Sequence, residues 1–411
     1  MNGKMTEKTD KLPWKLKIIL ILFIAANVIS FTRGFQNNEL FYFGKFALIG
    51  AVFFLAALFV ANKGRIEIAE GVRGIYLFFC AWLFFMLVSL FNGPNPVSGV
   101  LVIGSYFLLF VIAFILFPNC IGQNNAYLEM KKVFLWATLV SLFGIVLYGF
   151  QDPNSWYIVG DRVRYQSFFA NPNFLGLFAF LGAMISLEIF AIIRSKKYLF
   201  FALPCLYLIY LSGSRAALLS IVVFCAVMFS LMVYSMIKRG REKNALKMFV
   251  FYFSLFAVSA GFYLVLSHWS DFYDPMQAIN QIFSFRPYYW IQELADLDVR
   301  GWLFGRGVGT EGLGAVRFDN FYFDTLIQAG LFGLVFMAAF LFSVLKRLFG
   351  FLNKKSGYWR RTGAASLAMF VAICAYSFFE SFLFSLGNVV SIYLWINVGS
   401  SVNKIDRGDS V

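Results

Sequence analysis

Long apolar runs, separated mostly by short polar stretches, recur along almost the whole chain. Runs of about 20 apolar residues can cross a lipid bilayer as helices, and 60% of the 411 residues are hydrophobic. The spanning runs that we predict are 18–31, 41–61, 74–91, 99–117, 133–150, 174–193, 198–211, 215–236, 248–267, 320–345, 363–379 and 382–399. The predicted fold class is therefore all-α, a polytopic integral membrane protein with about 12 transmembrane helices.

The positions of the basic residues orient these helices. If the N-terminus is cytoplasmic, the cytoplasmic segments hold 26 of the 35 Lys and Arg residues, and the external segments hold the other nine. Cytoplasmic loops of membrane proteins carry such an excess of positive charge. The bias favours twelve spans with both termini in the cytoplasm, and it explains the net charge of +14 without nucleic acid as a partner.

The lengths of the polar intervals predict the domain organisation. We expect a cytoplasmic N-terminus at 1–17, transmembrane helices 1–9 over 18–267, one larger external loop at 268–319, helices 10–12 over 320–399, and a cytoplasmic tail at 400–411. The first apolar run resembles a signal peptide. No convincing small-residue cleavage site follows it, so we interpret it as a retained first helix.

The basic residues of the predicted external segments are nearly all Arg. These nine are eight Arg and one Lys, whereas the cytoplasmic set contains 17 Lys and nine Arg. Arg can bind phosphate or carboxylate through two parallel hydrogen bonds, which Lys cannot do. We therefore predict an anion site on the external face, and ordinary ion pairing with Asp and Glu is the alternative.

Candidate chemistry gathers in the stretch 286–333, together with Arg215 and the segment 162–173. Arg215 opens a spanning helix directly after a Ser-Gly-Ser turn, and a helix N-terminus favours an anion. Asp319, where the external loop re-enters the membrane, is a candidate general base; an ion-pair partner or a helix cap is the alternative. Asp324 is a second candidate.

The glycine run 305–309 has the pattern Gly-x-Gly-x-Gly, but it lacks the strand, turn and helix setting of a dinucleotide fingerprint. We predict instead a tight turn that lets backbone approach a substrate closely.

Metal and thiol chemistry are disfavoured by the sequence. The five Cys residues are scattered without a Cys-x-x-Cys pair, and His268 is the only histidine. Asp296-Leu-Asp298 is a weak metal signal on its own. We predict no metal and no cofactor.

Four loose motifs occur in a fixed order on the predicted outer face. They are Arg164-x-x-x-Phe-Phe-x-Asn-Pro-Asn173, Ser212-Gly-Ser-Arg-Ala-Ala-Leu-Leu219, Arg286-x-x-Tyr-Trp290 followed by Leu303-Phe-Gly-x-Gly-x-Gly-Thr310, and Asp319-Asn-x-Tyr-x-x-x-Leu-x-x-x-Gly-Leu-x-Gly333. With this ordered set, the chain resembles the O-antigen ligase/polymerase superfamily of bacterial polytopic glycosyltransferases.

The resemblance implies a GT-C-like architecture that transfers a glycan from an undecaprenyl-diphosphate-linked donor, on the outer side of the bacterial inner membrane, without metal. It implies that Arg215 and Arg286 grip the diphosphate and that Asp319 activates the acceptor hydroxyl. Ligases typically have His at that position, so Asp319 favours a polymerase. The substrate-binding residues that we predict are Arg164, Asn171, Asn173, Tyr289, Trp290, Arg306, Arg317 and Asn320. The expected partners are the lipid-linked donor and acceptor, membrane lipid, and the chain-length regulator and flippase of the same pathway.

Two alternatives stay open. An O-antigen ligase or a protein oligosaccharyltransferase would share the donor and differ in the acceptor. A transporter or lipid flippase would also fit twelve spans, but it should place charged or broken-helix features near the bilayer midplane. The spanning runs are nearly free of charge, which favours chemistry at the outer edge.

Overall fold

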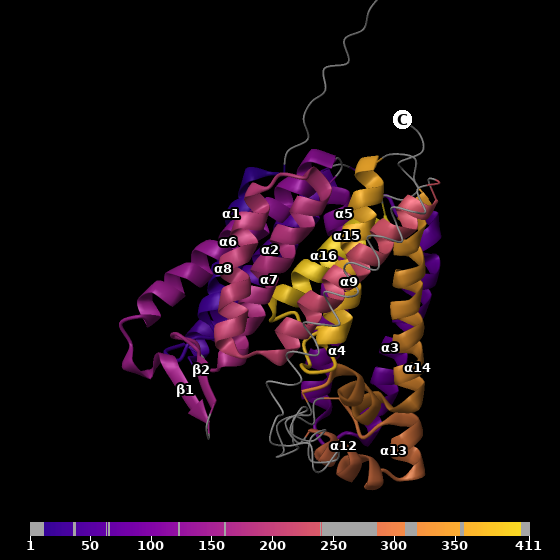
Figure 1. The fold of residues 1–411 in the computed structure, drawn as a ribbon. Coiled ribbons are helices and arrows are strands. Elements are labelled where there is room, and N and C mark those ends of the chain that lie inside the picture. The colour runs from indigo at the N-terminus through magenta and orange to yellow at the C-terminus, as the bar shows by residue number, and fades with distance from the viewer. Residues whose placement is uncertain are drawn as a thin grey trace, which may run out of the picture.

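The computed structural model describes residues 12–35, 38–62, 64, 66–121, 124–159, 162–238, 240, 286–308, 319–353 and 357–403. Its long helices pack side by side in one bundle, with short helices and a hairpin at one end (Figure 1). The helices are α1 (Trp14–Ile29), α2 (Glu39–Asn62), α3 (Arg73–Ser89), α4 (Pro96–Phe110), α5 (Phe117–Cys120), α6 (Asn124–Gly149), α7 (Pro172–Ile193), α8 (Lys197–Ser212), α9 (Arg215–Ile237), α12 (Arg286–Ala295), α13 (Val299–Phe304), α14 (Phe321–Phe349), α15 (Gly357–Tyr376) and α16 (Val389–Val402). A π-helical segment, η3 (Val111–Leu116), joins α4 to α5, and single 3₁₀ turns lie at Glu70–Val72, Leu90–Asn92, Pro153–Ser155 and Gly350–Asn353.

The nearly all-α fold agrees with the sequence prediction. Eleven of the twelve predicted runs coincide with a described helix over most of their length or part of it, and the twelfth, 248–267, lies outside the described residues. Seven of the helices described are long and apolar enough to span a membrane, and two further apolar helices, α8 and α16, are shorter. The architecture is therefore that of a polytopic membrane protein, while the number of twelve crossings stays a prediction.

The last predicted run, 382–399, is wrong at its start. Helix α16 begins only at Val389, and the α15–α16 connection (residues 377–388) is a series of turns. Side chains of α16 satisfy this backbone, because Ser391 Oγ and Trp395 Nε1 both donate to the Leu383 carbonyl, at 2.9 and 2.6 Å. An apolar composition therefore does not require a helix where buried backbone finds other partners.

A small β-hairpin was not predicted. Strands β1 (Trp156–Val159) and β2 (Arg162–Tyr165) pair antiparallel, with Tyr157 opposite Arg164. The hairpin follows α6 and lies beside the end of α8 (Figure 1). It therefore brings Arg164 to the α8–α9 turn.

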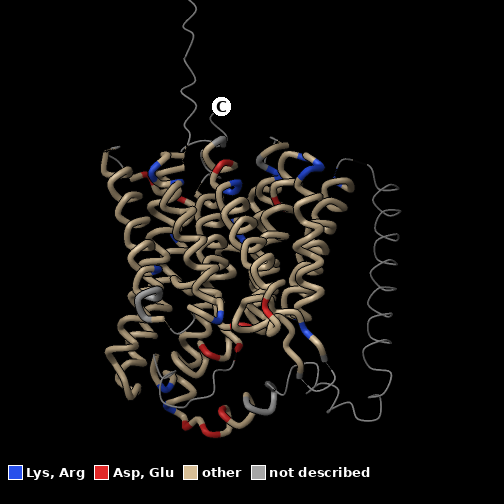
Figure 2. Tube along the Cα trace, turned by 90° about the vertical axis from the view of Figure 1, so that its left-hand side faces the viewer, with Lys and Arg blue, Asp and Glu red and all other residues tan. Residues whose placement is uncertain are grey.

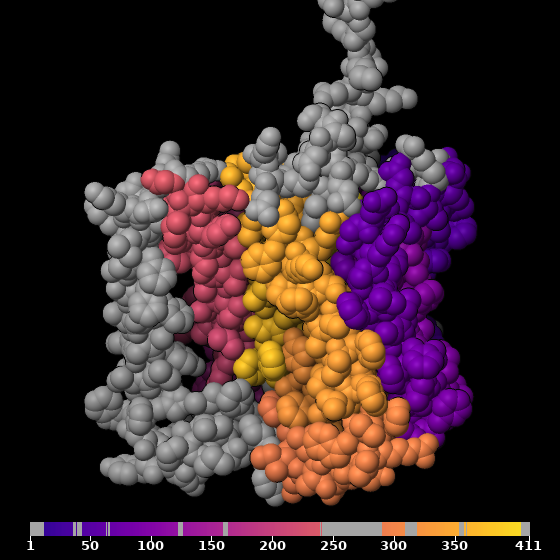
Figure 3. All heavy atoms as spheres, turned by 90° about the vertical axis from the view of Figure 1, so that its right-hand side faces the viewer, coloured from indigo at the N-terminus to yellow at the C-terminus, as the bar shows by residue number. Residues whose placement is uncertain are grey.

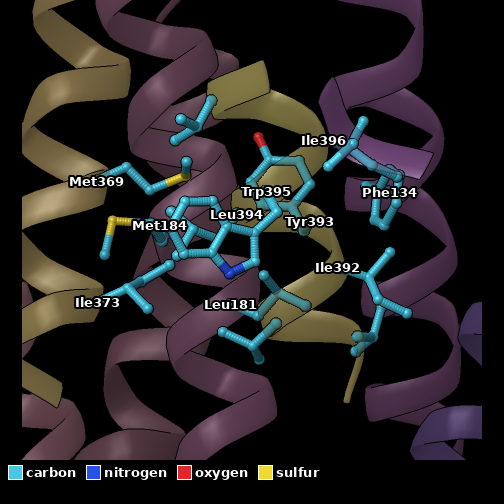
Figure 4. Close-up of a cluster of buried hydrophobic side chains, with 14 of the residues drawn as sticks. Phe134, Leu181, Met184, Met369, Ile373, Ile392, Tyr393, Leu394, Trp395 and Ile396 are labelled. Carbon is cyan, nitrogen blue, oxygen red and sulfur yellow. The ribbon is translucent and has the colours of Figure 1, made fainter. Parts of the chain in front are cut away.

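Helices α7 and α16 form the centre of the bundle. Of the apolar window in α7, 78% is buried, against 22% for α9, and every residue of α16 is buried. Trp395 and Tyr393 of α16 pack with Leu181 of α7 and Met369 of α15 (Figure 4). Helix α16 can be short because it is enclosed by protein and has no lipid boundary to match.

A buried ion pair lies inside this centre. Lys131 Nζ of α6 lies 2.5 Å from Glu188 Oε1 of α7, and both side chains are fully buried. Asn397 of α16 accepts from Lys131 at 2.6 Å and donates to Glu188 at 2.8 Å, and Tyr393 donates to Glu188 at 2.5 Å. Lys131 precedes the predicted run 133–150 but lies within α6 and is buried, so the helical bundle contains an ionic group that the predicted bounds of this run left out.

Charge separates the two ends of the bundle. Most Lys and Arg residues lie at one end (Figure 2), which we call the basic end. At this end α1, α3 and α15 begin and α7 and α14 finish, with Lys15, Arg73, Arg360, Arg194 and Lys346 at or near these helix termini. The opposite end, which we call the site end, carries the hairpin, the N-terminus of α9, and helices α12 and α13 (Figure 1).

Candidate active site

Gly330 interrupts helix α14 at the site end. At Gly330, φ is +69° and ψ is −172°, so the helix is interrupted one-third of the way along its length. The break leaves carbonyls of the preceding turn available, and the backbone N–H groups of Arg306 and Gly307 donate to Ile327 and Gln328, at 2.7 and 3.2 Å. The glycine run after α13 therefore docks into the break.

The prediction of a tight turn at Gly305 and Gly307 agrees with the structure, since both have positive φ. For these two residues the structure shows a close approach to other parts of the chain, and the close approach to a substrate stays a prediction. A Cβ at Gly305 would overlap the Gln328 carbonyl, and one at Gly307 would overlap Gly93. The close approach is to the chain's own backbone, and Gly309 lies outside the described residues.

Helices α12 and α13 lie against the part of α14 at the site end (Figure 3). Trp290 of α12 stacks on Phe323 of α14, with 4.6 Å between ring centroids and 19° between planes. Arg306 pairs with Glu293 at 3.2 Å and also donates to the Asp296 carbonyl. Trp290 and Arg306, both predicted to bind substrate, therefore attach α12 to α13 and α14.

Asp298 caps α13 by accepting from the Gly301 N–H at 2.7 Å. In the part of the chain that the structure describes, no three His, Cys, Asp or Glu side chains gather closely enough to hold a metal ion.

Arg164 connects three segments that are far apart in sequence. Its Nε donates to the Ser212 carbonyl at 2.8 Å, and its terminal nitrogen donates to Asn173 Oδ1 at 2.6 Å. Gly213 has a φ of +59°, and a Cβ there would lie only 3.2 Å from Arg164 Nε. Arg164 therefore braces the α8–α9 turn against the first turn of α7.

This brace fixes the start of α9. Arg215 is its first residue, and the preceding Ser214 makes no side-chain cap. Ala216 and Ala217, the next two residues, are small and buried. The N-terminal turn of a helix presents backbone N–H groups that lack intrahelical acceptors, and the helix dipole adds partial positive charge. A half-buried guanidinium thus lies at an N-terminus that is suited to an anion.

The α15–α16 connection brings a further carboxylate to this place. Asn173 Nδ2 lies 3.5 Å from Glu380 Oε1, so the Asn173 amide lies between the Arg164 guanidinium and a carboxylate. A few residues earlier, the Ser377 carbonyl accepts from the Phe321 N–H at 2.9 Å. The connection therefore joins the Arg164 brace to the start of α14.

Asp319 and Asn320 have different roles at the start of α14. Asn320 is 1% exposed, and its Oδ1 caps the helix by accepting from the N–H groups of Tyr322 and Phe323, at 3.0 and 3.2 Å. Asp319 precedes the cap, is half-buried, and has a φ of +48°, which is uncommon for a residue with a Cβ. The helix cap is therefore Asn320, and the alternative that Asp319 caps the helix is wrong.

The structure leaves part of the predicted site unplaced. Arg317 lies outside the described residues, and for Arg286 and Tyr289 only the backbone of α12 is described. Asn171 caps α7 by accepting from the Asn173 N–H at 2.8 Å.

Sequence reasoning missed Glu380. A signal for it was present, because Glu380 is the only charged residue between Arg361 and Lys404.

Comparison with known families agrees with the ordered motifs. Residues 199–338 match the family model described as O-antigen ligase, a region that contains Arg215, α12, α13, the start of α14 and its break. A search of curated proteins found no match. Residues 199–338 of this membrane protein are therefore similar to the O-antigen ligase family.

Proposed function

We propose that this protein is a polysaccharide polymerase of the cell envelope, making O-antigen, capsule or exopolysaccharide. It transfers the growing glycan from undecaprenyl diphosphate to a lipid-linked repeat unit on the outer face of the bacterial inner membrane. The family match supports glycosyl transfer of the O-antigen ligase or polymerase kind. The residues of the site end support the finer assignment.

The observation that carries the proposal is the N-terminus of α9. A guanidinium, a helix N-terminus without a side-chain cap, and two small residues lie together, and Arg164 holds the preceding turn in place. Charge develops on the diphosphate as the glycosidic bond breaks, and fixed donors aimed at that charge lower the barrier. Arg215 acts as one arm of the clamp, and Arg286 at the start of α12 is the proposed second arm.

The acceptor sugar requires a group that orients or deprotonates its hydroxyl. Asp319 is suited to this role because the neighbouring Asn320 cap and the Phe321–Ser377 hydrogen bond fix its backbone. General base action contributes about 10²–10⁴ in rate. Since ligases of this superfamily typically carry His at this position, Asp319 favours a polymerase over a ligase.

The decisive experiment compares glycans in the host strain. The gene is deleted and replaced by wild type, Asp319→Ala or Arg215→Lys, and both lipid-linked and surface glycans are separated on a gel. We expect deletion to leave single repeat units, wild type to restore long glycan, and both variants to fail. The Lys variant should lose about 10²-fold or more of the product, because the planar fork is removed while the charge is kept.

Arg300→Lys is the matched control, since Arg300 is an exposed arginine of α13 with no ion pair among the residues described. Full activity of Arg215→Lys would refute the diphosphate clamp. Long glycan that stays on its lipid carrier in the deletion strain would indicate a ligase. Single repeats that accumulate on the cytoplasmic side would indicate a transporter.

A further inference from the structure

A large cavity opens between helices α7, α8, α9 and α15, near the basic end and remote from the N-terminus of α9. Its volume is about 1160 Å³, above the roughly 300–1,000 Å³ of sites for drug-sized ligands. The walls are mainly apolar and include Phe190, Phe224 and Met228. A small inorganic anion would leave most of this surface uncovered, so the ligand needs a long apolar part.

One end of the cavity is strongly basic. Five cationic side chains line it, and no Asp or Glu lies among its described lining residues; the five are Arg194, Lys196, Lys238, Arg360 and Arg361. Arg194, Lys196 and Arg360 have no carboxylate partner within the described parts of the chain. An excess of positive charge is expected at cytoplasmic helix ends. That rule does not explain why five of these charges lie around one apolar cavity.

Arg361 is held in a geometry that suits an anion. Its Nε donates to the carbonyl of Ile192, near the end of α7, at 2.9 Å. Its two terminal nitrogens make no hydrogen bond within the residues that the structure describes. A guanidinium that is fixed through Nε keeps its terminal pair of donors for a bidentate contact with a phosphate.

We propose that this cavity binds an anionic phospholipid, with the phosphate of the headgroup among the five basic residues and the acyl chains along α9. Basic pockets between transmembrane helices at the cytoplasmic side suit such headgroups. The side chains of α9 favour a lipid as the ligand. Met232 and Tyr234 line the cavity, Ile237 lies beside it, and each is about half exposed, so apolar surface is left for acyl chains to cover. The proposal requires a membrane protein, and it does not depend on the polymerase assignment.

The test is native mass spectrometry of the purified full-length protein in detergent, titrated with phosphatidylglycerol or with phosphatidylcholine of the same acyl chains. We expect tight binding of phosphatidylglycerol and weak binding of phosphatidylcholine. The triple variant Arg194→Gln, Lys196→Gln, Arg360→Gln should bind phosphatidylglycerol about 100-fold more weakly. Ala364→Trp, which fills the cavity and keeps its charge, should also lose binding.

The matched control is the triple variant Lys15→Gln, Arg73→Gln, Lys346→Gln, which removes three cations of the basic end that do not line the cavity. It should bind phosphatidylglycerol like wild type. Equal losses in both triple variants would overturn the proposal, because binding would then follow total charge. Displacement of phosphatidylglycerol by millimolar inorganic phosphate would also overturn it, since the cavity would then be a site for free phosphate.

Discussion

Lys131 and Glu188 show how single residues decide the stability of this bundle. Both are fully buried, and Asn397 bonds to each of them. Burying a charge in an apolar medium is costly unless it is paired and fully hydrogen-bonded, and removing one partner leaves the other uncompensated. The pair therefore fixes the relative positions of α6, α7 and α16 more than it adds net stability.

A double-mutant cycle on this pair should show strong coupling. Lys131→Met or Glu188→Gln alone should destabilise the protein by about 3–5 kcal/mol, because each leaves a buried charge without its counter-ion. The double variant should lose clearly less than the sum of the two. Heat-induced loss of the monodisperse peak in detergent measures this, and strictly additive losses would show that the two groups act independently.

At the scale of elements, the sequence predicted where helices lie but not how their ends are built. Apolar runs of spanning length gave most helices, because a lipid environment requires internally bonded backbone. The turns at 377–388 escaped prediction, since their apolar residues match a helix in composition and only contacts with Ser391 and Trp395 distinguish them. The β-hairpin escaped because each of its strands has only four residues.

The candidate site was predicted only in part, because local sequence patterns do not show tertiary contacts. Local patterns identified Arg215 after its Ser-Gly-Ser turn and Asp319 at the start of a helix. They could not reveal that Trp290 and Arg306 serve the packing of α12, or that Glu380 approaches Asn173 from 207 positions away. Those facts depend on tertiary contacts.

The break in α14 gives a test at this scale. Gly330→Ala should reduce both stability and glycan product, because φ of +69° with ψ of −172° is essentially restricted to glycine and costs a Cβ-bearing residue about 1–3 kcal/mol. Overlap with the Leu303 carbonyl adds to that cost. The midpoint of thermal unfolding in detergent, together with the glycan gel, measures both effects.

Gly144→Ala is the control for this test, since Gly144 lies within α6 and a Cβ there meets no atom within 4 Å. It should leave the thermal midpoint and the product unchanged. A wild-type midpoint for Gly330→Ala would show that α14 can close its break without loss.

At the scale of the whole molecule, the two ends of the bundle differ in both charge and construction. The basic end holds helix termini rich in Lys and Arg, while the site end holds the hairpin, α12, α13 and the glycine-dependent docking (Figures 1 and 2). Positive charge is retained on the cytoplasmic side during insertion. We therefore expect the basic end in the cytoplasm and the site end outside.

Single cysteines introduced at Arg300 and Lys346 test this orientation, in a background chain whose five native Cys residues are replaced by Ser. A membrane-impermeant maleimide applied to intact spheroplasts should label Arg300→Cys and leave Lys346→Cys unlabelled until the membrane is opened. Both positions are exposed, so burial does not protect either of them. The reverse pattern would place the candidate site in the cytoplasm and exclude the proposed donor.

The complete enclosure of α16 has a consequence for how the protein is made. This helix is the last of the described helices to leave the ribosome, and every one of its residues is buried against earlier ones. Until it arrives, Lys131 and Glu188 lack the Asn397 amide that bonds to both. The bundle therefore cannot close until α16 has been synthesised, and a nascent chain cut short near residue 388 would expose buried polar and charged side chains to membrane quality-control proteases.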